Sequence, residues 1–210
     1  MDFDNTLRVE KIPSNIGKEF IKQHHYSHGV HNGPMCYGLL QDERLVGVCA
    51  FATPCSENVR ASIFGADNKH RVTELHRLVL LDEMPRNTES WFISRALKEL
   101  KKNKPELWGI LSFADATEGH LGIIYQATNA LYLGTSSPAT FYIDQTGRLR
   151  HPRQNGVNIT RQMAEQNGWS PVKREGKHRY LYILPDSKTH KKQLLKSIKS
   201  PQFPYPKVKG

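Results

Sequence analysis

A carboxylate and a tyrosine flank a glycine-containing turn near the middle of the chain. The apolar run Leu107–Ala114 predicts a strand, and Asp115 follows it directly. Because ligands of open α/β sheets bind beyond the carboxyl ends of strands, Asp115 is a candidate catalytic residue, although such a residue also caps turns. Tyr125 lies in a helix predicted over 121–133, with Gly134 as its end, and is either a general acid or a core residue.

Histidines gather just after the first predicted helix, which spans Asn15–His25. The cluster comprises His24, His25, His28 and His31. Imidazole nitrogen binds transition metals, so the cluster is a candidate metal site, with surface histidines at a helix end as the alternative. The three cysteines form no C-x-x-C pair and offer zinc no competing thiolate site.

Arg77 lies in a strand predicted over 70–81. It is either a surface charge on an edge strand or a fixed bidentate clamp for a carboxylate or phosphate. A helix predicted over 88–102 follows, and Ser90 in its first turn either caps the helix or helps its N-terminus hold an anionic donor group. Arg86, just before this helix, is a further candidate phosphate ligand.

Four blocks of this sequence resemble the Mom family of phage DNA-modification proteins, which carbamoylmethylate adenine and belong to the wider GNAT acyltransferase-like group. The resemblance covers roughly residues 15 to 145. The blocks are His24-His25-Tyr26-Ser27, Glu74-Leu75-His76-Arg77-Leu78, Glu89-Ser90-Trp91, and "FADATEGHLGIIYQATNALYLG" with Asp115 and Tyr125.

The resemblance implies an α+β, GNAT-like fold in which a central mixed, twisted sheet is flanked by helices. It implies an enzyme that converts adenine to N6-(carbamoylmethyl)adenine in double-stranded DNA and so shields the DNA from restriction. It also implies iron, held by His25, Tyr26 and Asp115. The implied catalytic residues are His25, Tyr26, Arg77, Ser90, Asp115 and Tyr125, and those implied to bind the cofactor are Arg77, Arg86 and Ser90.

The chain departs from the GNAT pattern before the helix at residue 88. GNAT enzymes hold the pyrophosphate of coenzyme A with a glycine-rich loop, whereas residues 81–89 contain no glycine and three acids. The donor is therefore left open between acetyl-CoA and another acyl-type molecule. Two other functions also stay open: an N-acetyltransferase acting on a protein or small-molecule amine, and a non-catalytic DNA-binding protein.

The basic excess of the chain lies in its last third. Residues 147–210 hold 15 Lys/Arg against 3 Asp/Glu, whereas residues 1–146 hold 15 against 17. A solvated basic face is one interpretation, and a surface that neutralises DNA phosphates is the other. The charge distribution favours a polyanionic partner.

The elements that position these residues form a single predicted domain over 1–184, followed by a basic Pro/Lys-rich tail over 185–210 that is either mobile or ordered by a partner. The N-terminus has no signal-peptide pattern, and we expect a cytoplasmic protein without membrane spans. The remaining predicted elements are a hairpin over 35–40 and 44–53, strands over 140–144 and 178–184, and a short helix over 159–166.

Overall fold

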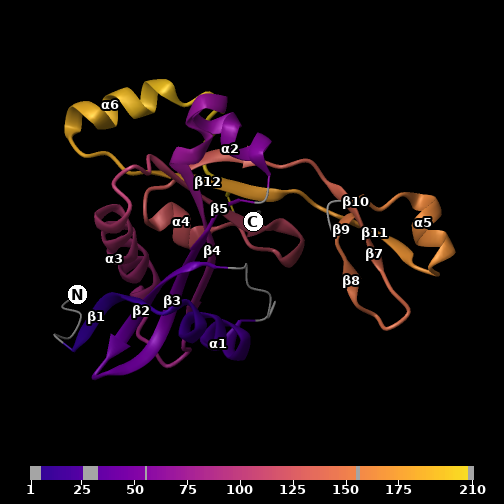
Figure 1. The fold of residues 1–210 in the computed structure, drawn as a ribbon, viewed down its shortest axis with the longest axis horizontal. Helices are drawn as coiled ribbons and strands as arrows, with labels where there is room; N and C mark the ends of the chain where they lie inside the picture. Colours follow the sequence, from indigo (N-terminus) through magenta and orange to yellow (C-terminus); the bar gives the residue numbers. More distant parts are fainter. Residues whose placement is uncertain (1–5, 26–32, 55, 155–156, 208–210) are drawn as a thin grey trace.

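The computed structural model describes residues 6–25, 33–54, 56–154 and 157–207. Its centre is a mixed seven-stranded sheet with the order β1-β2-β3-β4-β5-β12-β6 (Figure 1). Helices cover both faces of this sheet, so the predicted α+β class with a central mixed sheet is confirmed. No helix in the described ranges is long and apolar enough to cross a membrane.

Every element predicted for the N-terminal half is present, and a strand over 7–12 and a helix over 57–64 were not predicted. The predicted hairpin is closed by the two-residue turn Asp42-Glu43, in which both residues have positive φ angles of 45° and 68°. Such turns match the twist of paired strands. The elements of this half are β1 (Leu7–Ile12), α1 (Ser14–His24), β2 (Met35–Gln41), β3 (Arg44–Ala52), α2 (Glu57–Phe64), β4 (Val72–Leu80), α3 (Thr88–Asn103) and β5 (Gly109–Asp115).

Strand β4 lies inside the sheet, antiparallel to β3 and parallel to β5. Its pairing with β5 joins only Val72–Leu75 to Gly109–Ser112, so the carboxyl-terminal parts of the two strands do not pair. Because β4 is not an edge strand, the interpretation of Arg77 as a surface charge on an edge strand is wrong.

A β-bulge interrupts β4 at His76. Arg77 pairs with Ala50 of β3, and Leu75 pairs with the next residue of β3, which leaves His76 as an extra residue. Side chains alternate between the two faces of a sheet, and one extra residue resets that alternation. Glu74, His76 and Arg77 therefore share one face, whereas the regular alternation of the sequence predicts Arg77 on the opposite side.

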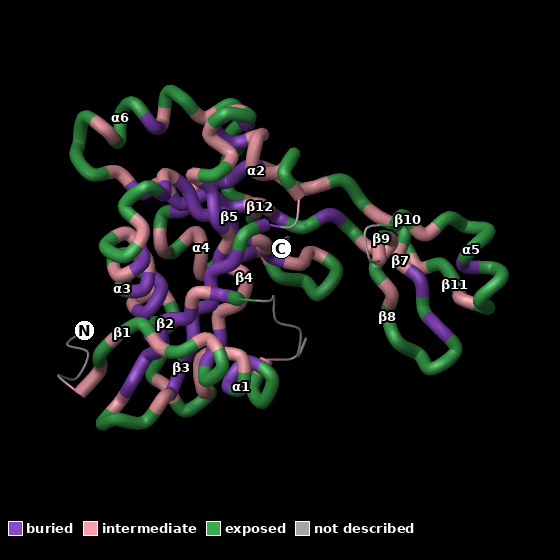
Figure 2. Tube along the Cα trace, viewed as in Figure 1, coloured by how far each residue is buried: buried purple, intermediate pink, exposed green. Residues whose placement is uncertain are grey.

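Two helical layers define the faces of the sheet. On one face, α3 packs Phe92 and Ile93 against Leu75 and Ile110. On the other face, α1 covers the half of the sheet around β2, β3 and β4, and α2 covers the half around β5 and β12. We call these two sides the α3 face and the α1/α2 face. The buried residues run continuously through the sheet (Figure 2).

The helix predicted over 121–133 is wrong in its second half. Only α4 (Ile123–Ala127) is helical, and β6 (Leu131–Thr135) is a strand. Asn129 adopts a left-handed φ of 61°, which is incompatible with a continuing helix. Gly134, predicted to end the helix, instead lies within β6 at a φ of 76°.

A small unit projects from the main sheet between β6 and β12 (Lys177–Ile183) (Figure 1). We call residues 139–174 the projecting module. It contains a three-stranded sheet with the order β11-β7-β8, a two-stranded pair and one helix. Its elements are β7 (Ala139–Ile143), β8 (Leu149–Arg150), β9 (Arg153–Gln154), β10 (Val157–Asn158), α5 (Arg161–Gln166) and β11 (Ser170–Arg174).

The prediction of a mobile tail from residue 185 is wrong. Residues Lys188–Ser197 form α6, whose Leu194 is buried with Phe64 and Leu181. Beyond α6, the backbone N–H of Phe203 donates to the carbonyl of Tyr132 at 2.9 Å, along the outer strand β6. The many lysines of this segment favoured a solvent-exposed tail. Its few apolar residues, however, pack on the main sheet and hold the segment there.

Candidate active site

Polar residues gather on the α1/α2 face where β4 and β5 cease to pair. The bulge places Glu74, His76 and Arg77 on this face of β4. On β5, Leu111 and Phe113 pack beside α2, so the alternation places Asp115 on the same side. Helix α1 covers this face and is followed directly by His25, whose N–H donates to the carbonyl of Ile21 at 2.8 Å.

The side chains of Glu74 and His76 contact each other inside this group. The Glu74 Oε1 and His76 Nδ1 atoms lie 3.4 Å apart, and the side chains are 17% and 11% exposed. Neither residue is among the site residues that the sequence predicts. The bulge that places Arg77 beside them depends on pairing with β3 and not on β4 alone.

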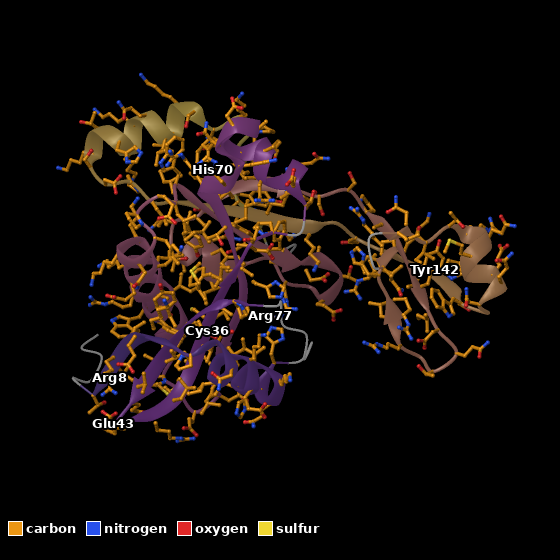
Figure 3. All side chains as sticks on the ribbon, in the orientation of Figure 1. Arg8, Cys36, Glu43, His70, Arg77 and Tyr142 are labelled. Carbon is orange, nitrogen blue, oxygen red and sulfur yellow. The ribbon has the colours of Figure 1, made fainter. Side chains whose placement is uncertain are left out.

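Arg77 lies near the centre of the molecule (Figure 3). Its Nη1 atom donates to the carbonyl oxygen of His76 at 2.7 Å, and the side chain is partly buried. This bond fixes the guanidinium next to the bulge. An immobilised, partly buried guanidinium is suited to holding a carboxylate or phosphate.

Asp115 caps the turn that follows β5 and is also ion-paired. Its Oδ1 accepts the N–H of Thr117 at 3.1 Å, and its Oδ2 lies 3.2 Å from Arg174 and 3.6 Å from Lys177. Arg174 is shared with Glu118 at 2.7 Å. Burial raises the pKa of Asp115, but Lys177 and Arg174 outweigh it and lower the pKa below its ordinary value. Asp115 is therefore a carboxylate at neutral pH.

The contacts of Asp115 decide whether this residue could bind iron. Arg174 and Lys177 lie beside the Oδ2 atom of Asp115 and would repel a metal cation, so Asp115 does not fit as a metal ligand in this arrangement. Tyr26 lies outside the described residues. Within the described ranges, no group of three or more His, Cys, Asp and Glu side chains could hold a metal ion.

Tyr125 belongs to an aromatic group on the α3 face. Its ring lies 5.3 Å from that of Tyr180 and 6.5 Å from that of Tyr182. Burial raises the pKa of Tyr180 and of Tyr182, so both are neutral phenols. The structure therefore puts Tyr125 on the opposite side of the sheet from Arg77 and Asp115, and both the general-acid and the core interpretation of Tyr125 stay open.

The N-terminus of α3 has no side-chain cap. The capping interpretation of Ser90 is wrong, because its hydroxyl donates to the carbonyl of Asn87 at 2.9 Å and accepts no helix N–H. Arg86 is exposed just before this helix. Arg44 pairs with Glu83 at 2.6 Å and so offsets one of the three acids of the segment.

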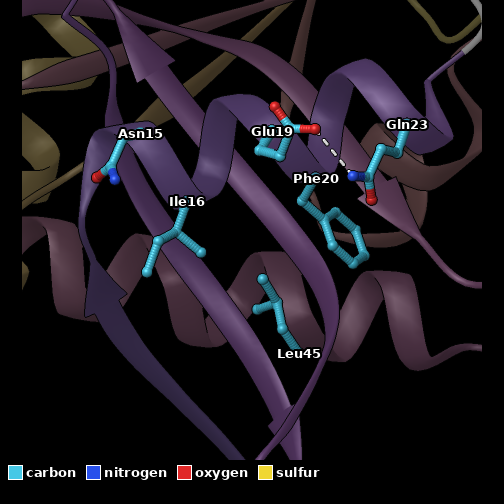
Figure 4. Close-up of a pocket in the computed structure, with 6 residues that line it drawn as sticks. All are labelled: Asn15, Ile16, Glu19, Phe20, Gln23 and Leu45. Atoms are coloured by element: carbon cyan, nitrogen blue, oxygen red, sulfur yellow. Dashed lines mark hydrogen bonds between the residues drawn. The ribbon is translucent and has the colours of Figure 1, made fainter.

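A shallow, largely apolar groove lies elsewhere, between α1 and the β2–β3 hairpin (Figure 4). None of the candidate site residues lines it. Its lining consists of Asn15, Ile16, Glu19, Phe20, Gln23 and Leu45. The groove is thus separate from the polar group between β4 and β5.

The chain is similar to several solved acetyltransferases in outline only. A spermidine N-acetyltransferase from Vibrio cholerae, solved as a point mutant, has a TM-score of 0.48 and 11% identity, covering 86% of this chain and 95% of its own. A GNAT family acetyltransferase from Elizabethkingia anophelis, solved with acetyl-CoA, has a TM-score of 0.42 and 11% identity, covering 86% and 100%. At these scores the likeness carries no information about a donor.

Similarity in sequence is more specific. The methylcarbamoylase Mom of Escherichia phage Mu is 38% identical to this chain over 138 residues. The matched region covers 65% of this chain and 56% of the relative, so the chain spans just over half the length of the relative it matches. The profile of the Mom protein family matches residues 6–207, nearly the whole described chain, projecting module and α6 included. The chain belongs to the Mom protein family.

Proposed function

We propose that this protein modifies the exocyclic N6 of adenine in DNA, forming N6-(carbamoylmethyl)adenine that protects phage DNA from restriction. The observation that carries the proposal is the family match over residues 6–207, supported by the identity to a phage methylcarbamoylase. Duplex DNA as partner and the bacterial cytoplasm as location belong to the same proposal.

The arrangement of the site is compatible with this chemistry. The N6 amine is paired within a duplex, so the adenine must leave the base stack to react. Asp115 is an ionised acceptor held in place by Arg174 and Lys177, suited to orienting an amine N–H. Arg77 supplies a fixed cation on the same face for a carboxylate or phosphate of the donor.

The donor would bind between this group and the N-terminus of α3. That helix end offers backbone N–H groups without a side-chain cap, with Arg86 and Ser90 beside it. A bound acyl-type donor, acetyl-CoA or another, would supply the transferred carbon. The product joins N6 to a methylene carbon and the amine loses a proton, so simple acetyl transfer does not produce it.

We propose iron only through His25 and Tyr26, because two cations already lie beside Asp115. Metal analysis and a visible spectrum of anaerobically purified protein test the proposal, with His25→Ala and Tyr26→Phe as the informative variants. We expect each variant to lose iron, because each removes one proposed ligand. A tyrosinate ligand to ferric iron would also colour the wild-type protein, and Tyr26→Phe should lose this colour. Unchanged iron in both would reject the assignment.

Mass spectrometry of nucleosides from the DNA of cells expressing the protein tests the function. We expect a modified deoxyadenosine that carries the carbamoylmethyl group and is absent from cells expressing Asp115→Asn. An acetylated protein or polyamine, without any modified nucleoside, would favour the alternative of a GNAT N-acetyltransferase. Unmodified DNA that is nevertheless bound tightly would favour a non-catalytic DNA-binding protein.

A further inference from the structure

The three-stranded sheet of the projecting module has one covered and one open face. On the covered face lie Tyr142, which is buried, and Arg150, which stacks on Trp169 at 5.7 Å. Helix α5 packs on this side through the buried Ala164. The covered face is therefore the core of the module.

The opposite face is apolar and exposed. The register pairs Ile143 with Leu149, and these side chains are 39% and 40% exposed. Phe141 and Val172 pair with each other on the same side, closer to the main body. Of the eight large apolar residues exposed in the described chain, four lie in this module. An uncovered apolar sheet face of this kind marks a binding surface.

An arginine and a histidine flank the aromatic residue at the centre of this face. The guanidinium of Arg174 lies 5.6 Å from the ring of Phe141, and the ring of His151 lies 5.0 Å from it. Arg174 also reaches Asp115 at 3.2 Å. The open face is thus continuous with the candidate site, because a single arginine contacts both.

We propose that this open face binds unpaired bases of the DNA substrate next to the adenine that reacts. This inference rests on the proposed function, since extruding an adenine exposes the flat faces of its neighbours and of its former partner. An aromatic ring with apolar neighbours and a flanking arginine is the arrangement that stacks bases without reading their sequence. The phosphates of a nucleic acid would also be attracted by the module's basic balance, which is 6 Lys/Arg against 2 Asp/Glu over residues 139–174.

Binding of oligonucleotides to purified full-length protein tests the proposal. The probes are a single-stranded oligonucleotide, a duplex with one unpaired adenine, and the fully paired duplex. We expect Phe141→Leu to weaken binding of the first two probes about fivefold, because stacking on an aromatic ring is lost. The double variant Ile143→Thr with Leu149→Thr should act in the same direction. The fully paired duplex should be affected least.

Two controls separate this surface from general effects. Val157→Thr and Met163→Gln also replace exposed apolar residues of the module but lie outside the open face, and they should leave binding unchanged. None of these variants removes a charge, so the salt dependence of binding should stay as in the wild type.

The proposal is overturned if folded Phe141→Leu and the double variant bind all three probes like the wild type. It is equally overturned if the double variant changes only the sedimentation of the protein, because the face would then join two copies of this chain. Modified adenine in cells together with unchanged binding would reject this inference and leave the proposed function standing. Weaker binding by the variants, together with no modified nucleoside in cells, would reject the proposed function and leave this inference standing.

Discussion

The basic third of the chain splits into two regions that use charge differently. In α6 and the residues just after it, five exposed lysines have no acidic partner in the described structure, namely Lys188, Lys191, Lys192, Lys196 and Lys199. In the projecting module, three arginines are bound to carboxylates: Arg150 to Asp144, Arg161 to Glu165, and Arg174 to Asp115 and Glu118. A count of basic residues in the sequence therefore does not show which of them are available to bind a phosphate.

The two regions also lie at opposite ends of β5. His190 of α6 packs against Trp108, just before β5 begins, whereas Arg174 contacts Asp115 where β5 ends. Seven strand residues separate these points by about 20 Å, which corresponds to about six base pairs of duplex. A duplex positioned by one region can thus present a base at the other.

The largest effect should come from the paired carboxylate. Asp115→Asn removes one charge without changing volume, leaves Lys177 without this partner and leaves Arg174 with Glu118 alone. We expect the modified nucleoside to fall at least about a hundredfold, as when a preorganised charge is removed from a reaction site. Asp67→Asn, an exposed carboxylate far from this group, is the control. Retained modification by folded Asp115→Asn would make Asp115 a turn cap only.

The next effect concerns the free lysines. Lys188, Lys192 and Lys196 lie four residues apart on one side of α6, so replacing all three by glutamine removes one stripe of charge. The slope of log affinity against log salt should flatten by about two to three units. Truncation at residue 185 is a poorer test than the sequence suggests, because it also removes the buried Leu194.

The matched control for this stripe is Arg161→Gln in the module. Arg161 is bound to Glu165 at 2.8 Å, so its charge is already offset and the slope should change little. Equal flattening by the single arginine and by the three lysines would remove the distinction between the two regions. An unchanged slope in the triple variant would mean that α6 is a solvated face.

The smallest effect is on stability in acid. Hydrogen bonds from Thr146, together with Arg148 and Arg150, hold the pKa of Asp144 well below its ordinary value. A depressed pKa in the folded state contributes stability above the unfolded pKa, and this stability is lost as the pH falls through about 4 and below. Hydrogen exchange in residues 139–174 should therefore quicken in acid before that of β2–β4. In Asp144→Asn, hydrogen exchange in residues 139–174 should no longer respond to acid earlier than hydrogen exchange in β2–β4.

Local pattern predicted much of the framework and little of the site. Helices α1 and α3 and the β2–β3 hairpin follow from the spacing of apolar residues and from turn chemistry, and the structure confirms them. The prediction of a helix over 121–133 was wrong because a continuous apolar run is as typical of a strand buried on both faces as of a helix. Tyr132 and Leu133 are adjacent in β6 and both are buried. The partners of Asp115 come from residues 174 and 177, and no local pattern predicts such distant pairing.

The bulge at His76 has a consequence for how this protein tolerates change. His76 is the extra residue, so its deletion would make the strand regular and would leave Arg77 paired with Ala50 and on the same face. Closing the bulge without losing a residue would instead turn Arg77 toward the apolar residues beneath α3. The side to which Arg77 points is thus specified by the bulge, and deletion of His76 should disturb the strand less than deletion of a residue that pairs regularly with β3.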